Sequence, residues 1–256
     1  MLAARAKIYV DASSRDPRPR RGGAPRAARQ LGLALFLAAA FAAAPARASE
    51  PVASAIVFAV DVSGSVDDER YEVQRAGIAS IFVNPGIAQM LQGGLAIMLM
   101  EWADDHVVTV PWTILRAPKD AAAFAARVRR APRSPGYSTA LSLALLAAAD
   151  LLDGCGCAAQ HRVIDISGDG PNNGPVSAKL ARDQVLARGI RINGLPIVTP
   201  AEPDLAQWYA ANVVGGDGAF VEVALGYADF ARAMQRKFLL EVAGGTRERA
   251  ALAARR

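Results

Sequence analysis

The sequence predicts an α/β protein built on a doubly wound, mostly parallel six-stranded sheet, with one antiparallel edge strand and helices on both faces. Short apolar runs alternate with helical patterns over residues 55–242, as is typical of a parallel sheet. At residues 94–115 two strands follow each other with no helix between them, which indicates a hairpin and an antiparallel edge. No internal repeat or interior linker interrupts this region, so we expect one domain over residues 49–243.

The strands are expected at apolar runs that are too short for a buried helix. The first run, AIVFAV at residues 55–60, is apolar at every position, as expected of a strand that helices cover on both faces. The other strands are expected at residues 94–101, 107–115, 162–167, 190–197 and 219–223.

The helices are expected in the segments between these runs. The first, at residues 67–83, has three acidic residues in its first turn, where negative charge interacts favourably with the helix dipole. The helix at residues 139–152 is nearly all alanine and leucine, so we expect it to be buried. The remaining helices are expected at residues 119–130, 176–188, 203–213 and 227–242.

Residues 1–48 have the pattern of a signal peptide. A basic segment at residues 17–29 precedes an uncharged apolar run at residues 31–45, and Ala46 and Ala48 provide the small side chains that a signal peptidase recognises. We therefore expect cleavage before Ser49, a periplasmic or secreted protein, and no membrane span after cleavage. The apolar run is shorter than the roughly 20 residues that cross a bilayer as a helix. An uncleaved N-terminal anchor is the alternative.

The basic charge of the chain belongs to this leader. The full sequence carries a formal net charge of +5, and residues 1–48 hold nine basic and two acidic residues. Residues 49–256 then carry 20 basic and 22 acidic side chains. This near balance argues against a nucleic-acid-binding protein. The last residues, 244–256, are expected to form a disordered basic tail.

The two cysteines are separated by one glycine, as Cys155-Gly156-Cys157. In an oxidising compartment this pair has several interpretations, namely two reduced thiols, an intermolecular disulfide, or a strained disulfide within the loop. Two thiols alone make a poor metal site, so we assign no function to them.

Carboxylates and hydroxyls follow the predicted strands at one edge of the sheet, where ligands of open α/β sheets bind. Three loops contribute them: Asp61, Ser63 and Ser65 follow the first strand, Thr139 precedes a helix, and Asp169 follows the fourth strand. Such an all-oxygen set suits magnesium, manganese or calcium, whereas zinc and copper prefer nitrogen or sulfur. Two carboxylates leave a divalent cation near neutrality, so an external anion can complete its coordination shell.

The pattern Asp61-x-Ser63-x-Ser65 after an apolar strand, with a distal threonine and a later Asp-Gly, resembles a von Willebrand factor type A domain. The resemblance extends over residues 54–243. Segments such as VIDISGDGPNN and VVGGDGAFV are also similar to a family of exported bacterial proteins with a domain of unknown function.

This resemblance implies a metal-ion-dependent adhesion site. In such a site the five residues hold Mg²⁺, with Mn²⁺ or Ca²⁺ as alternatives, and a protein partner supplies an acidic side chain as a further ligand. The adjacent Ser138 is the alternative to Thr139, because the register of that loop is open.

The same residues also have simpler interpretations. Ser65 or Asp67 could cap a helix, Thr139 could cap another, and Asp169 between two glycines could form a turn. A bound ion could also serve a metal-dependent hydrolase or phosphatase, or join three loops in a purely structural domain. The expected site contains no base such as histidine, so we predict a binding module rather than an enzyme.

Other acidic residues near the predicted strands are expected to be structural. Asp165 interrupts an apolar strand, and a buried carboxylate needs a partner, for which Arg162, Arg133 or a backbone amide could serve. Asp104 and Asp105 follow a strand at the same edge as the predicted site. A solvated turn is expected there, and added negative potential near the ion is the alternative.

Overall fold

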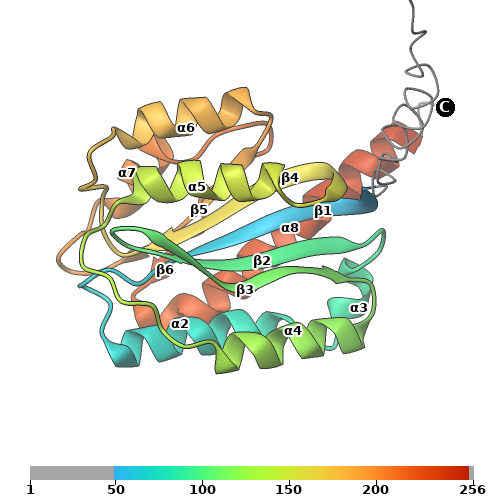
Figure 1. The fold of residues 1–256 in the computed structure, drawn as a ribbon, viewed down its shortest axis with the longest axis horizontal. Helices are drawn as coiled ribbons and strands as arrows, with labels where there is room; N and C mark the ends of the chain where they lie inside the picture. The colour runs from blue at the N-terminus through green and yellow to red at the C-terminus, as the bar shows by residue number, and fades with distance from the viewer. Residues whose placement is uncertain (1–48, 254–256) are drawn as a thin grey trace, which may run out of the picture. The chain divides into compact units, whose positions relative to one another are not determined.

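The structure is a computed structural model that describes residues 49–253, so the predicted leader lies outside the described part. In that part, one six-stranded sheet carries helices on both faces, which confirms the predicted α/β fold (Figure 1). The strand order is β3-β2-β1-β4-β5-β6, and every neighbouring pair is parallel except β2 and β3. The strands are β1 (Glu50–Asp61), β2 (Leu95–Trp102), β3 (His106–Leu115), β4 (Cys157–Gly168), β5 (Arg191–Val198) and β6 (Ala224–Leu225).

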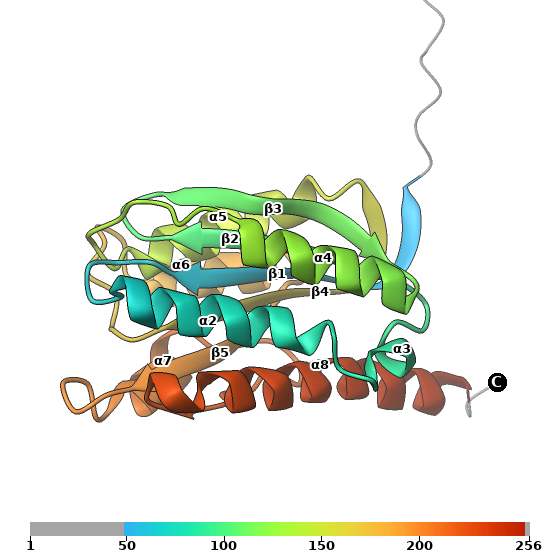
Figure 2. The ribbon, with the colours of Figure 1, turned by 90° about the horizontal axis from the view of Figure 1, so that it is seen from below.

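Two layers of helices cover the sheet (Figures 1 and 2). One layer packs on the face that carries Phe58 and the other on the face that carries Val57, because neighbouring residues of a strand point to opposite faces. The first layer comprises α2 (Asp68–Ile81), α3 (Ile87–Met90), α4 (Pro118–Arg130) and α8 (Phe230–Ala253). The second comprises α5 (Leu141–Asp153), α6 (Ala178–Ala187) and α7 (Leu205–Asn212).

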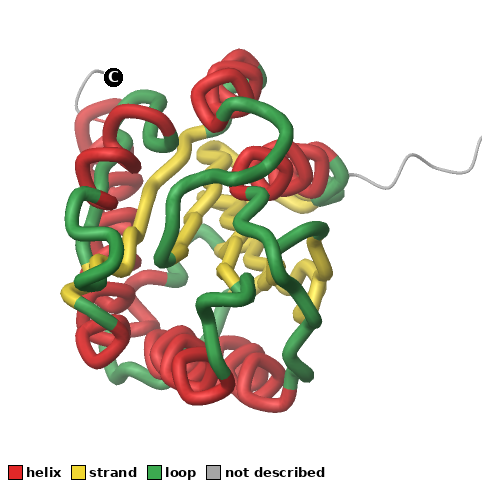
Figure 3. The backbone as a smooth tube through the Cα atoms, turned by 90° about the vertical axis from the view of Figure 1, so that its left-hand side faces the viewer, coloured by secondary structure: helices red, strands yellow, loops and turns green. Residues whose placement is uncertain are grey.

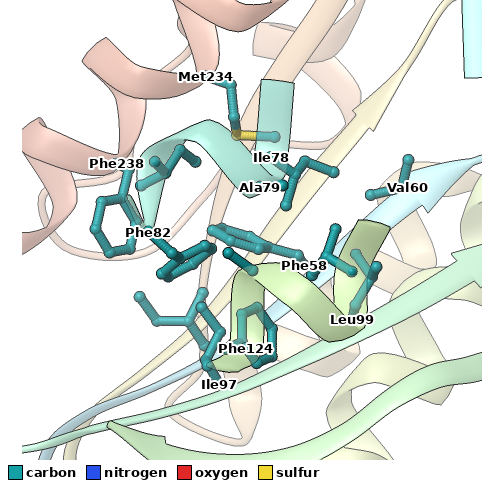
Figure 4. Close-up of a cluster of buried hydrophobic side chains, with 14 of the residues drawn as sticks. Phe58, Val60, Ile78, Ala79, Phe82, Ile97, Leu99, Phe124, Met234 and Phe238 are labelled. Atoms are coloured by element: carbon teal, nitrogen blue, oxygen red, sulfur yellow. The ribbon is translucent and has the colours of Figure 1, made fainter. Parts of the chain in front are cut away.

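The core under the first helix layer contains a cluster of aromatic rings (Figure 4). Phe82, which follows α2, has its ring centroid 6.1 Å from that of Phe58, 4.9 Å from that of Phe124 and 5.6 Å from that of Phe238. Such aromatic pairs contribute about 0.5–1.5 kcal/mol each beyond the burial of their area. The cluster therefore fixes α2, α4 and α8 against β1, and with them the start of α2 beside the end of β1.

The winding of the chain changes direction beside β1. From β1 the chain continues to β2 on one side, whereas β4 pairs with β1 on the other side. Open α/β sheets bind ligands at the carboxyl ends of the strands at such a switch point. Val60 pairs with Ser167, so the loop after β1 begins beside the loop after β4. Figure 3 is turned toward this edge and shows the loops that cross the strand ends.

The last strand lies later in the chain than predicted. The sequence predicts a strand at residues 219–223, but β6 is Ala224–Leu225, and Val221 makes just an isolated bridge with Gly194. Gly216 and Gly218 have φ angles of 98° and 68°, which favour glycine. Gly215 makes an isolated antiparallel bridge with Ile192, the chain then turns at these two glycines, and β6 pairs with β5 only after them.

The closing helix also differs from its prediction at residues 227–242. Tyr227–Asp229 form a short 3₁₀ helix, η1, and α8 begins at Phe230. Its helical backbone continues to Ala253 and so includes residues 244–253, which the sequence assigns to a disordered tail. The arginines, glutamate and alanines there are good helix formers. The domain limits at residues 49 and 243 stay predictions. No helix of the described part has the length and apolar character that a membrane span requires.

The strand β3 forms the antiparallel edge of the sheet, as predicted. Its register with β2 is irregular: Ile97 pairs with Thr113, whereas Leu99 pairs with Val110. Pro111 lies in this irregular stretch and has no N–H to donate to a neighbouring strand. This edge is therefore interrupted near its middle.

The two cysteines lie between α5 and β4. Cys155 follows the end of α5 and Cys157 opens β4, and a disulfide joins them across a Cα–Cα distance of 5.2 Å. Of the open interpretations, the structure therefore has the bond within the loop.

Candidate metal centre

Asp61 is the last residue of β1, and its side chain is completely buried. Its Oδ1 accepts a 2.8 Å hydrogen bond from the backbone N–H of Ser63, which stabilises the turn after β1. Its Oδ2 is buried and has no hydrogen-bond partner within the described residues. Gly168, at the end of β4, lies so close that a Cβ there would come within 2.7 Å of this Oδ2. The two strand ends therefore meet at Asp61.

The loop after β1 is connected to the loop after β4 by a short chain of hydroxyls. The Oγ atoms of Ser63 and Ser65 lie 3.3 Å apart, and Ser65 donates a 2.6 Å hydrogen bond from its Oγ to Oδ1 of Asp169. Asp169 is itself only 6% exposed. The structure thus brings together four of the five predicted site residues. They come from two loops, and Ser65 and Asp169 are 104 residues apart in the chain.

Thr139 is held at the same edge of the sheet by two hydrogen bonds between its backbone and Asn173. Its N–H donates to Oδ1 of Asn173 at 2.8 Å, and the N–H of Asn173 donates to the carbonyl of Thr139 at 2.9 Å. Two residues earlier, the carbonyl of Tyr137 accepts a 3.0 Å hydrogen bond from the N–H of Gly64. The third loop is therefore bonded to both of the others. Asn173 was not selected from the sequence, although it ends the segment VIDISGDGPNN.

Asp104 bears on the choice between Thr139 and Ser138, which stays a prediction. The Asp104 carboxylate accepts from the backbone N–H groups of Tyr137 at 2.7 Å and Ser138 at 3.1 Å. A hydrogen bond from the Ser138 side chain, together with these N–H groups, holds the pKa of Asp104 below its ordinary value. The hydroxyl of Ser138 is thus engaged with Asp104, and Asp104 braces the loop rather than facing the site.

A cavity of about 580 Å³ opens beside these loops, and we call it the rim cavity. Its wall includes the guanidinium of Arg70, from the first turn of α2, which no sequence pattern indicated. Arg70 Nη1 donates to the carbonyl of Ser65 at 2.5 Å and lies 3.9 Å from Oδ2 of Asp169. The rim cavity is lined by Ser65, Arg70, Thr139, residues 169–173 and residues 199–202.

Two tyrosines also face the pair of carboxylates, and no sequence pattern indicated either of them. Tyr227 donates a 2.9 Å hydrogen bond to Oδ2 of Asp169. Tyr209 of α7 is fully buried, and its hydroxyl would lie 2.9 Å from a Cβ on Gly168, beside Oδ2 of Asp61. Among the described residues, the Tyr209 hydroxyl has no hydrogen-bond partner. Burial, followed by the charges of Asp61 and Asp169, raises the pKa of Tyr209, which stays neutral.

Burial dominates the electrostatics of Asp61. Loss of solvent raises the pKa of its carboxyl to about 7, and the neighbouring charge of Asp169 acts in the same direction. Hydrogen bonds from Ser63 oppose this shift in part. A second carboxylate close by makes the ionised form costly in the absence of a positive charge. A cation between the loops would remove this cost.

The donor set fits a hard divalent cation. It consists of two carboxylates and three hydroxyls, all oxygen, as magnesium and calcium prefer. The unpartnered Oδ2 of Asp61 is the kind of buried polar atom that calls for an ion or water. Within residues 49–253, no three histidine, cysteine, aspartate or glutamate side chains gather as a metal-binding group, and the candidate site has only two. Hydroxyl groups and water would therefore have to supply the remaining oxygen ligands of an ion held by these side chains.

Asp165, the other carboxylate singled out in β4, has a different partner from those suggested by the sequence. Its Oδ1 lies 2.5 Å from Nζ of Lys237 in α8, which also lies 2.8 Å from Oε1 of Glu241. Arg162 instead pairs with Asp153, and Arg133 pairs with Asp68. Of the three predicted alternatives, Arg162 and Arg133 were wrong, and no backbone amide within the described residues donates to Asp165. The sequence near Asp165 does not encode the position of α8 on the sheet, which brings Lys237 to it.

Comparisons with known proteins agree with this fold. A family model described as "Protein of unknown function (DUF1194)" matches residues 51–246. Among curated proteins, none matches the sequence. The solved structure of a von Willebrand factor type A protein from Catenulispora acidiphila is 20% identical, with a TM-score of 0.51 over 73% of this chain and 42% of that chain.

Two further solved structures are similar at lower identity. Proximal thread matrix protein 1 from the mussel byssus, with a zinc-occupied MIDAS motif, is 14% identical, with a TM-score of 0.50 over 76% of this chain and 47% of that chain. The pilus adhesin SpaC from Lactobacillus rhamnosus GG is 13% identical, with a TM-score of 0.54 over 77% of this chain and 30% of that chain. The chain thus spans less than half the length of these solved chains, and the likeness establishes the von Willebrand factor type A fold.

Proposed function

The chain belongs to the family described as "Protein of unknown function (DUF1194)", and from that starting point we propose that it is an exported, cation-dependent binding module. In this proposal Asp61, Ser63, Ser65, Thr139 and Asp169 hold a divalent cation. Mg²⁺ is the preferred ion, and Mn²⁺ and Ca²⁺ are alternatives. A protein partner binds by placing an acidic side chain on the ion.

The strongest support is the state of Asp61. Its Oδ2 is buried without a hydrogen-bond partner among the described residues, and the pKa of its carboxyl is raised to about 7. A buried carboxylate with one unpartnered oxygen is unfavourable in a protein that functions without a counterion. The Ser63–Ser65–Asp169 chain supplies further oxygen atoms next to it. A divalent cation would pair the two charges and give Asp61 Oδ2 a partner.

Solved proteins of the same fold support a cation site of this kind. The mussel protein carries zinc at its MIDAS motif, and SpaC is an adhesin. By analogy, we assign to this chain a cation that stays accessible to a partner. The rim cavity lies beside Ser65 and Asp169 and provides the access.

Binding is a better proposal than hydrolysis for this site. The rim cavity, within the described residues, is lined by no histidine, cysteine or lysine, so it offers none of the common proton-transfer side chains but carboxylates. A cation in this position supplies charge for recognition of an anion. Export to the periplasm or outside the cell, predicted from residues 1–48, places the module where it can meet partners there.

Thermal unfolding of the full-length protein with and without Mg²⁺ tests the proposal. At about 100 times its dissociation constant, a ligand of the folded state raises the free energy of unfolding by roughly 2.7 kcal/mol, which shifts the melting temperature by several degrees. We expect this shift in the wild type and its loss in Asp61→Asn and Asp169→Asn. Asp183→Asn, on the exposed side of α6, is the matched control and should keep the shift.

A shift of the same size in the Asp61→Asn and Asp169→Asn variants would place the ion elsewhere and overturn the assignment. Replacement of Mg²⁺ by Mn²⁺ and Ca²⁺ in the same assay identifies the preferred ion.

A further inference from the structure

Arg70 is a charged side chain that lies beside the candidate site and lines the rim cavity. Its Nη1 donates to the carbonyl of Ser65 at 2.5 Å and lies 3.9 Å from Oδ2 of Asp169. Both residues belong to the proposed ligand set. A permanent positive charge therefore lies next to the place where a divalent cation is proposed to bind, which weakens the binding of that cation.

The position of this guanidinium is fixed from several directions. It lies over the ring of Tyr227, with Cζ 5.2 Å from the ring centroid, and its Nε lies 3.5 Å from Oδ2 of Asp67. Its side chain is nevertheless 42% exposed and forms part of the wall of the rim cavity. Arg70 is thus held in place while part of its side chain remains exposed.

We propose that Arg70 is the second anion-binding point of this site, so that the partner's carboxylate places one oxygen toward the cation and the other toward the Arg70 guanidinium. This inference rests on the proposed function and adds a ligand class to it. A guanidinium stays charged and donates charge-assisted hydrogen bonds, so it can hold the carboxylate oxygen that does not face the cation. A neutral amide or hydroxyl oxygen gains little from such a pair of positive charges.

The other charges around the rim cavity strengthen this selection. Glu202 lines the rim cavity, and Oδ2 of Asp67 lies 3.5 Å from Nε of Arg70. Both groups repel an approaching carboxylate. Without Arg70, the attraction by the cation would have to overcome this repulsion by itself. Arg70 offsets this repulsion at the entrance. The site then favours a single acidic side chain whose carboxylate can reach both positive charges at once.

The proposal predicts effects of opposite sign on two ligands. Loss of the Arg70 charge removes repulsion of the cation, so Arg70→Gln should bind Mg²⁺ about threefold more tightly. The same variant loses a charge-assisted hydrogen bond to the ligand, so it should bind a carboxylate about tenfold more weakly. A variant that is merely misfolded would weaken both.

The experiment uses the full-length protein and two probes. Mg²⁺ binding is measured first by calorimetry. A short glycine peptide with one central glutamate, and the same peptide with glutamine, are then titrated in saturating Mg²⁺ and followed by NMR. The variants are Arg70→Gln, Arg70→Lys and, as the matched control, Arg75→Gln. Arg75 lies on the same helix and also over a tyrosine ring, but it pairs with Glu72.

We expect the wild type and Arg75→Gln to prefer the glutamate peptide, Arg70→Gln to lose most of this preference, and Arg70→Lys to lie between them. Equal glutamate binding by Arg70→Gln and the wild type, with Mg²⁺ binding intact, would overturn the role of Arg70 and leave the proposed function standing. If the wild type does not bind Mg²⁺, or if Asp61→Asn binds it as tightly as the wild type, the proposed function fails and this inference fails with it.

Discussion

The hydroxyl of Tyr227 donates a 2.9 Å hydrogen bond to Oδ2 of Asp169. Because Ser65 donates to Oδ1 of the same carboxylate, both oxygens of Asp169 are held by hydroxyl donors. Tyr227 belongs to η1, directly before α8, so the closing helix begins next to the candidate site. Burial, followed by the charge of Asp169, raises the pKa of Tyr227 and keeps it a neutral donor.

Replacement of Tyr227 by phenylalanine should destabilise the protein in the absence of divalent cations. The variant leaves the charged Asp169 with one donor fewer, and hydrogen bonds to charged groups contribute about 1.5–3 kcal/mol. We expect Tyr227→Phe to lower the free energy of unfolding by about this amount, measured by urea unfolding in EDTA. Tyr137→Phe, at a tyrosine that is 84% exposed, should change it by much less. Equal stability of Tyr227→Phe and the wild type would mean that the hydrogen bond carries no net energy.

Substitutions of Thr139 and Ser138 separate the two candidates for the threonine ligand. The hydroxyl of Ser138 bonds to Asp104, whereas Thr139 lies on the wall of the rim cavity. We expect Thr139→Val, which keeps the shape and loses the oxygen, to reduce the affinity for Mg²⁺ about tenfold. Thr139→Ser should restore it. If Ser138→Ala has the larger effect, the loop presents the other hydroxyl.

Asp104 should affect the site without contacting the ion. Its carboxylate holds the backbone N–H groups of Tyr137 and Ser138, directly before Thr139. Asp104→Ala releases this loop, so we expect a several-fold loss of Mg²⁺ affinity by calorimetry. The neighbouring Asp105 bonds to His106 beside it, and Asp105→Ala is the control that should bind like the wild type. Identical affinities of the two variants would argue against a bracing role.

The raised pKa of Asp61 predicts a pH dependence of stability in EDTA. Its carboxyl has a pKa of 3.8 when unfolded and about 7 in the fold, so the folded state binds this proton more tightly. Protonation of Asp61 therefore stabilises the folded state fully below pH 4, and this stabilisation is lost as the pH rises through 7. Asp61→Asn cannot titrate, so its stability relative to the wild type should improve by a few kcal/mol between pH 4 and pH 8. Parallel urea-unfolding profiles of the two proteins would contradict this.

Lys237 should be essential for the stability of the fold. Its ammonium is fully buried between the carboxylates of Asp165 and Glu241, and removal of one partner from such a group leaves uncompensated charge. We expect Lys237→Met to lower the free energy of unfolding by about 3–5 kcal/mol. Lys179→Met, on the exposed side of α6, should have little effect. A small loss in Lys237→Met would mean that the carboxyls take up a proton and need no ammonium.

The location of the candidate site residues was predicted best where those residues are close together in the sequence. Asp61, Ser63 and Ser65 follow one apolar strand within five residues, so their common location needed no knowledge of tertiary structure. Parallel strand ends meet at one edge, which was enough to bring Asp169 to the same place. Whether these residues hold a metal stays a prediction.

The surroundings of the site depend on contacts that no local pattern reveals. Arg70 and Tyr227 reach Asp169 from helices that are distant in the chain, and their approach depends on how α2 and α8 pack on the sheet. The same dependence explains the wrong partner for Asp165, since Lys237 is 72 residues away and belongs to the closing helix. Sequence periodicity predicts that α8 is a helix, but it does not predict the helix's position along the sheet.

The two edges of the sheet limit how this molecule can assemble. On one side β3 carries Pro111 and a register shift, and on the other side β6 is two residues long. Neither edge offers the long, regular row of free N–H and C=O groups that another strand needs for pairing. These edges protect the molecule from growth by strand addition at high local concentration, and they leave its loops and side chains as the surfaces available for contacts.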